Sequence, residues 1–111
     1  MNYHNKRFKS IQNSESGEVD AETIFHYRQG GSTLWATYRG GSIQFGTIIG
    51  KVDENGNIDM RYQHLSDDGT FKTGECLSTP EILANGKIRL HEVWQWTSGT
   101  EGKGQSIIEE V

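Results

Sequence analysis

Hydrophobic and polar residues alternate along most of the chain, in runs of six to eleven residues. One run, KIRLHEVWQWT at 87–97, places Ile88, Leu90, Glu92, Trp94 and Trp96 on one face. Successive side chains of a β-strand point to opposite faces, so this pattern predicts strands with one buried face. The glycine-containing segments QGGS, RGGS, DENG, SDDG and ANGK separate the runs. Such segments are typical of tight turns, and the whole pattern predicts an antiparallel all-β meander.

The turn lengths allow the buried face to be followed from strand to strand. Two-residue loops at Gly30–Gly31 and Gly40–Gly41 keep the apolar side chains on one face through the first strands. A four-residue loop at 53–56 then sets Phe45 opposite His64. Carried through the next turn, the face continues as Phe71, Thr73, Glu75 and Leu77. A slip of one residue would move a strand's apolar residues to the other face, so the continuity supports this register.

The number of strands constrains the architecture. Segments 6–11 and 105–111 add strands to the meander, which makes about eight. A sheet of this size with one apolar face and no helix to cover it must close or fold over itself. We therefore predict a small closed up-and-down barrel, with a two-layer sandwich and a half-open barrel as alternatives. The facing of residues 105–111 stays open, because the segment 98–104 permits either parity.

Composition and charge narrow the class of protein. A chain of 111 residues is the size of one domain, spanning 1–111, and 14 glycines with one proline indicate turns rather than disorder. The net charge of −4 argues against nucleic acid as a partner, because phosphate binding needs a basic surface. No apolar stretch resembles a signal peptide or a membrane span, so we expect a cytoplasmic protein without a membrane partner. A homo-oligomer stays possible.

Polar residues on the predicted inward face are the candidate chemistry. Glu75 and Glu92 fall on neighbouring strands and are expected to lie close together. Two carboxylates in a dry interior need partners, because burial and mutual repulsion both raise the pKa. They either point toward a water-filled mouth of the barrel or hold an internal hydrogen-bond network that fixes the register. Alternatively, they orient a small molecule in a pocket. The predicted ligand-binding residues are Glu92, Glu75, His64, Tyr62, Trp94, Trp96 and Tyr38.

Other kinds of site find little support in the sequence. No two histidines have the spacing of metal ligands, so we expect no metal site. The single cysteine, Cys76, has no histidine placed beside it and is predicted to be packed. A glycosidase with paired carboxylates would need a longer cleft than this chain provides. We expect no catalytic residue and no cofactor, and we favour a protein that is not an enzyme.

Three segments carry a resemblance to known proteins. GKVDENGNIDMRYQHL, TGECLSTPEILANGKIRLHEVWQWTSG and GQSIIEEV together resemble small, poorly characterised bacterial proteins often labelled n-acetylglutamate synthase. That label implies an acetyltransferase acting on glutamate. The strand pattern is also similar to the calycin group, the lipocalin- and avidin-type barrels, which implies binding of small apolar or amphipathic molecules.

Three functions therefore stay open. The favoured one is a small barrel of uncharacterised function that binds a small molecule in its interior. The second is an enzyme, either the acetyltransferase that the label implies or a small hydrolase that uses the same carboxylates. The third is a protein-interaction module that uses an exposed strand edge.

Overall fold

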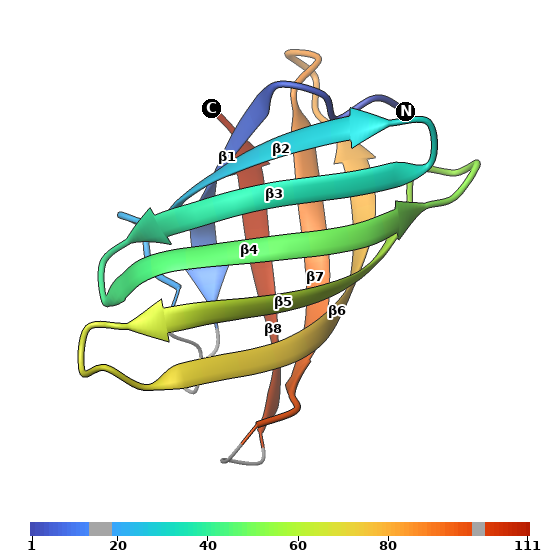
Figure 1. Cartoon of the computed structure of the whole chain (residues 1–111). Coiled ribbons are helices and arrows are strands. Elements are labelled where there is room, and N and C mark those ends of the chain that lie inside the picture. Colours follow the sequence, from blue (N-terminus) through green and yellow to red (C-terminus); the bar gives the residue numbers. More distant parts are fainter. Residues whose placement is uncertain (14–18, 99–101) are drawn as a thin grey trace.

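A computed structural model describes residues 1–13, 19–98 and 102–111, and these residues form a closed antiparallel barrel (Figure 1). Its strands are β1 (Lys6–Asn13), β2 (Ile24–Gly30), β3 (Thr33–Gly40), β4 (Ile43–Val52), β5 (Ile58–Ser66), β6 (Phe71–Ile82), β7 (Ile88–Trp96) and β8 (Lys103–Glu110). Each strand pairs with its neighbours in sequence, and β1 pairs with β8. The predicted up-and-down barrel is confirmed, and the sandwich and the half-open barrel are wrong. The described part of the chain has no helix that could cross a membrane.

Three of the hairpin loops share one geometry. In the β4–β5 hairpin the N–H of Asp53 donates to the carbonyl of Asn57, and the N–H of Gly56 donates back to the carbonyl of Asp53. The β5–β6 and β6–β7 hairpins repeat both bonds, and Gly56, Gly69 and Gly86 all have φ between 82° and 86°. A three-residue loop ending in a left-handed residue has this pattern. The predicted four-residue loop at 53–56 is therefore one residue too long.

The facing of β4 differs from the prediction because of a bulge and this loop length. The register shifts between Ile43 and Phe45, so Gly46 lies opposite Tyr38. Phe45, predicted to point inward, is 49% exposed on the outer face. The bulge moves the later residues of β4 to the face opposite to the predicted one. The three-residue loop then returns the residues of β5 to their predicted faces. His64, predicted inward, is accordingly buried on β5.

The facing of β6 is reversed along its whole length. Gly74, Cys76 and Ser78 point into the barrel, whereas Phe71 and Leu77 are exposed. A three-residue loop stands at each end of β6, so the predicted loops of four residues place the whole of this strand on the wrong face. On the last strand, whose facing was open, Ser106 and Ile108 are buried.

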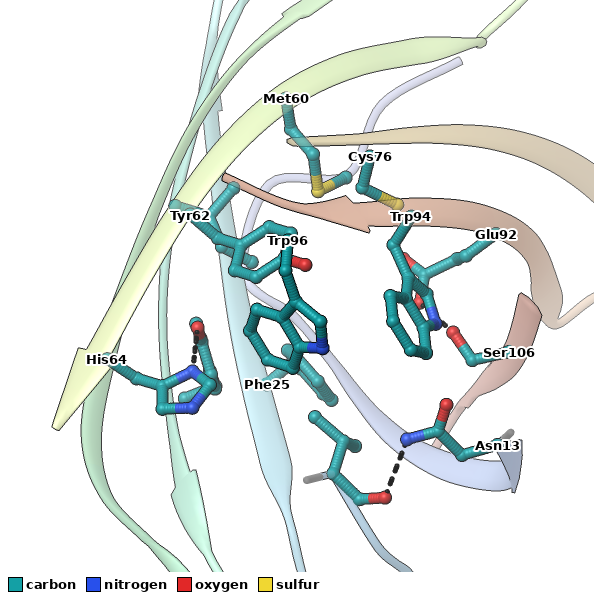
Figure 2. A pocket seen from close by; sticks show the side chains of 13 residues that line it. Asn13, Phe25, Met60, Tyr62, His64, Cys76, Glu92, Trp94, Trp96 and Ser106 are labelled. Carbon is teal, nitrogen blue, oxygen red and sulfur yellow. Dashed lines mark hydrogen bonds between the residues drawn. The ribbon is translucent and has the colours of Figure 1, made fainter. Parts of the chain in front are cut away.

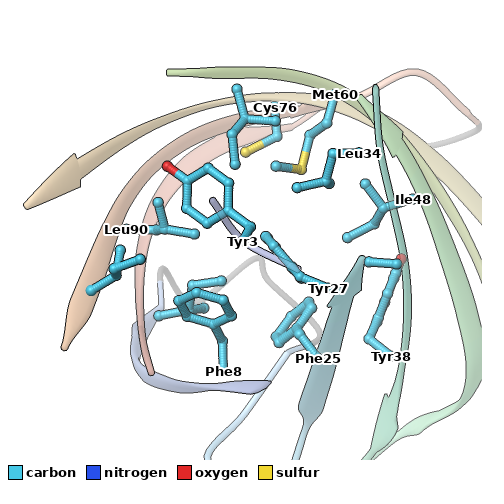
Figure 3. Packing of buried hydrophobic residues seen from close by; sticks show 14 of the residues in the cluster. Tyr3, Phe8, Phe25, Tyr27, Leu34, Tyr38, Ile48, Met60, Cys76 and Leu90 are labelled. Atoms are coloured by element: carbon cyan, nitrogen blue, oxygen red, sulfur yellow. The ribbon is translucent and has the colours of Figure 1, made fainter. Parts of the chain in front are cut away.

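One end of the barrel is closed by the N-terminal segment. Tyr3 is fully buried, with its ring centroid 6.2 Å from that of Tyr27 and 6.5 Å from that of Phe8. Its hydroxyl donates to the carbonyl of Gly56, and its N–H donates to Oε1 of Gln29 at 2.9 Å. Figure 3 shows the Tyr3 ring among the core side chains of several strands. The apolar core therefore fills this half of the barrel.

Candidate functional site

Figure 2 shows a cavity inside the barrel, of about 60 Å³, whose lining does not include Tyr3. Every strand contributes to its wall, which consists of Asn13, Val19, Phe25, Tyr38, Ile48, Met60, Tyr62, His64, Cys76, Glu92, Trp94, Trp96 and Ser106. A space of this size holds a few water molecules or a small organic group. Its lining is mostly apolar, with a few polar atoms that can orient a ligand.

Two tryptophans form the aromatic side of the cavity. Trp94 and Trp96 are successive inward residues of β7, with ring centroids 5.6 Å apart. The ring of Trp96 also lies 5.7 Å from Tyr62 and 5.8 Å from His64. The ammonium group of Lys72 lies 5.6 Å from the Trp96 ring centroid. These contacts hold Trp96 in place at the partly exposed edge of the cavity.

Two inward glycines make room for tyrosine rings. Gly46 lies directly opposite Tyr38, and Gly74 lies directly opposite Tyr62. A Cβ added to either glycine would overlap the ring of the facing tyrosine. Aromatic rings covering strand glycines are a known way to fill a sheet surface where a side chain is missing. The predicted facing of β4 and β6 was wrong, so the sequence did not indicate this arrangement.

A buried hydrogen bond joins strands β3 and β5 in the cavity wall. The hydroxyl of Tyr38 and Nδ1 of His64 are 2.8 Å apart, and both side chains are 3% exposed. Phe25 stacks on Tyr38 with ring centroids 5.1 Å apart. His64 is thus held in one orientation at the wall.

Glu92 is the buried carboxyl of the cavity. It is 9% exposed, and its two oxygens accept hydrogen bonds from the hydroxyls of Ser78 and Ser106, each at 3.0 Å. These serines face Glu92 directly from the neighbouring strands β6 and β8. Burial raises the pKa of Glu92 to about 7, although hydrogen bonds from Ser106, Ser78 and Cys76 oppose the shift. The carboxyl therefore changes charge near neutral pH.

A bulge in β1 brings Asn13 to the same wall. The register with β8 shifts between Ser10 and Gln12, so Asn13 and not Gln12 lies opposite Ser106. The Asn13 amide donates from Nδ2 to the carbonyl of Val19 at 2.8 Å. Its Oδ1 is buried and has no hydrogen-bond partner among the described residues. The sequence did not indicate Asn13 or Ser78, because a bulge turns Asn13 inward and three-residue loops turn Ser78 inward, and it left the facing of Ser106 open.

Glu75 does not belong to this site. It lies on the outer face of β6, where its side chain is 47% exposed and Oε2 is 3.7 Å from Nε of Arg61. The prediction that it points inward beside Glu92 is wrong, because the three-residue loops on both sides of β6 reverse its facing.

The other predicted ligand-binding residues all line the cavity. They are Glu92, His64, Tyr62, Trp94, Trp96 and Tyr38. Their binding role stays a prediction. Cys76 is buried beside them, and burial together with the nearby Glu92 raises the pKa of its thiol well above the usual range. Within residues 1–13, 19–98 and 102–111, no group of three or more His, Cys, Asp or Glu side chains is placed to hold a metal ion.

Comparison with known proteins agrees with this architecture. The model of a family described as "Avidin-like protein" matches residues 1–111. No curated protein matches the chain, and no solved structure does.

Proposed function

The chain belongs to the avidin-like family, and from that premise we propose that its barrel binds a small molecule in the cavity beside Glu92. The observation that carries the proposal is a carboxyl that is buried in an aromatic-walled cavity with only hydroxyl and thiol partners. The described part of the cavity wall contains no lysine or arginine. A few polar atoms set in an apolar cavity are typical of small-molecule sites.

Energetic cost distinguishes this proposal from a purely structural role for Glu92. Burying an ionisable carboxyl is unfavourable unless hydrogen bonds compensate. Ser78 and Ser106 supply one bond to each oxygen, and an ionised carboxylate has acceptor sites for about four. A ligand that binds the remaining sites would offset part of the cost. A packed hydrophobic side chain would fill the same place without the free-energy cost of burying a carboxyl.

The other two functions find no support. An acetyltransferase acting on glutamate is favoured neither by the all-β barrel nor by the family match. An interaction module needs an exposed strand edge, and β1 pairs with β8 in a closed barrel. The strand-edge hypothesis is therefore wrong.

A ligand screen by NMR tests the proposal. Small organic molecules of a size that fits the cavity of about 60 Å³ are titrated while the three tryptophan indole N–H signals are followed. A ligand in the cavity should shift the signals of Trp94 and Trp96. Trp35, 42% exposed on the outer face, is an internal control and should not move. Hits that move only Trp35, or the absence of any hit, would contradict the proposal.

Thermal stability gives a second measurement for each hit. A specific ligand at a hundred times its Kd adds about 2.7 kcal/mol to the free energy of unfolding. A ligand that moves the Trp94 signal at saturating concentration and yet leaves the free energy of unfolding unchanged would bind the unfolded chain equally well. Such a ligand would not support a binding site in the folded barrel.

A further inference from the structure

The chemistry of the cavity wall indicates which class of ligand it takes. One row of residues crosses four adjacent strands: Ser78 on β6 faces Glu92 on β7, Glu92 faces Ser106 on β8, and Ser106 faces Asn13 on β1. Neighbouring strands lie about 4.8 Å apart, so Asn13 and Glu92 are separated by about 10 Å along this row. A single small molecule between the two side chains could contact both.

Most hydrogen-bond donors of this row are already used. The hydroxyls of Ser78 and Ser106 both donate to Glu92, and one of the two amide N–H groups of Asn13 donates to the carbonyl of Val19. What the row mainly offers is therefore acceptors: the carboxylate, the hydroxyl lone pairs and the buried Oδ1 of Asn13, which has no partner in the described part of the chain. A buried acceptor without a donor costs free energy, so a donor-rich ligand group fits here best.

We propose that the cavity selects a small primary ammonium compound, with its N–H groups donating to Glu92 and the neighbouring acceptors of the row. This inference rests on the proposed function and specifies its ligand. An ammonium group has three donors, no acceptor and the charge opposite to that of Glu92.

The aromatic side of the cavity supports a cation as well. Trp94 is the next inward residue after Glu92 on β7, and Trp96 follows it. A cation placed against an indole ring is attracted to it, and the attraction is stronger away from water. The carbon part of the ligand must be small to fit a cavity of about 60 Å³.

Three probes of one carbon skeleton test the inference: isobutylamine, isobutanol and isovalerate, which are cationic, neutral and anionic. At pH 8.5 isobutylamine should shift the Trp94 and Trp96 indole signals and bind at least tenfold more tightly than either of the others. Equal or tighter binding of isobutanol or isovalerate at this site would overturn the inference and leave the proposed function standing. Absence of binding by all three probes and by the wider screen would remove both.

The pH dependence identifies the group that responds. With a pKa near 7, Glu92 is about 3% ionised at pH 5.5 and about 97% at pH 8.5, so isobutylamine should bind about 30-fold more tightly at pH 8.5. The titratable groups around Glu92 are Cys76 on β6, Tyr62 and His64 on β5, Tyr38 on β3 and Tyr27 on β2. Burial raises the pKa values of Cys76, Tyr62 and Tyr27, which keeps all three neutral over this range.

Matched variants separate Glu92 from the remaining groups. Glu92→Gln should abolish both the preference for the amine and its pH dependence, while His64 stays unchanged. Glu75→Gln makes the same change on the outer face and should leave binding as in the parent protein. A preference that persists in Glu92→Gln would overturn the inference. Should Glu92→Gln not fold, Asn13→Ala replaces it and should weaken isobutylamine about fivefold, the effect of one hydrogen bond. Unchanged binding there would count against the ammonium site.

Discussion

At the scale of single residues, the protonation of Glu92 links the cavity to the stability of the fold. Its pKa is about 7 in the folded protein and 4.5 as an ordinary value. Below pH 4.5 the carboxyl is protonated in both states. As the pH rises from 4.5 to 7 the unfolded state ionises first, so the free energy of unfolding falls. The loss is complete above pH 7 and amounts to about 3 kcal/mol.

Glu92→Gln should remove this pH dependence. The stability difference between the variant and the parent should change by about 3 kcal/mol in favour of the variant between pH 4 and pH 8. Chemical denaturation at both pH values measures it. Glu75→Gln, on the exposed face, should show a much smaller change. A Glu92→Gln difference that is constant with pH would mean that the carboxyl is not destabilised by burial.

At the scale of elements, the strands could be predicted from the sequence and the facing of two of them could not. Alternation within β7 correctly placed Glu92 and Trp94 inside, because that pattern depends on one strand alone. The facing of β6 depends on the loops before and after it, and a loop of three instead of four residues turned Glu75 outward. Asn13 faces inward only because of a bulge, which leaves no signal in the alternation.

The glycines beneath the tyrosine rings give a test of the packing in β5 and β6. Gly74→Ala would push a methyl group into the ring of Tyr62 and should cost about 1–3 kcal/mol. Denaturant titration measures the loss. Gly30→Ala is the control, because a Cβ there lies 3.5 Å from the Trp35 ring, an ordinary contact. Equal effects of the two changes would show that the Tyr62 ring does not rest on Gly74.

At the scale of the whole molecule, the two ends of the barrel have different roles. The N-terminal segment closes one end with a buried aromatic ring, and the cavity lies in the other half. The sequence did not indicate which end is covered, because Tyr3 precedes the first strand and belongs to no alternating run. The two halves of the barrel therefore differ, since one is packed around Tyr3 and the other holds the cavity.

Removal of the Tyr3 ring should destabilise the whole barrel. Tyr3→Ala should cost about 3–5 kcal/mol, as other buried aromatic truncations do, and Tyr3→Phe about 1 kcal/mol for the hydrogen bond to Gly56. Asn2→Ala, in the exposed part of the same segment, should stay within about 0.5 kcal/mol of the parent. A Tyr3→Ala loss no larger than that of Asn2→Ala, measured by thermal or denaturant unfolding, would mean that the segment does not close the barrel.

Cys76, the sole cysteine, is buried, so its reaction with alkylating reagents can report local opening of the barrel. Alkylating reagents attack the thiolate form, and burial together with Glu92 keeps this sulfur protonated inside the wall. Alkylation is therefore slow in the intact barrel, and its rate rises with the population of molecules in which the strands around β6 have separated. The alkylation rate thus reports how often the strands around β6 separate.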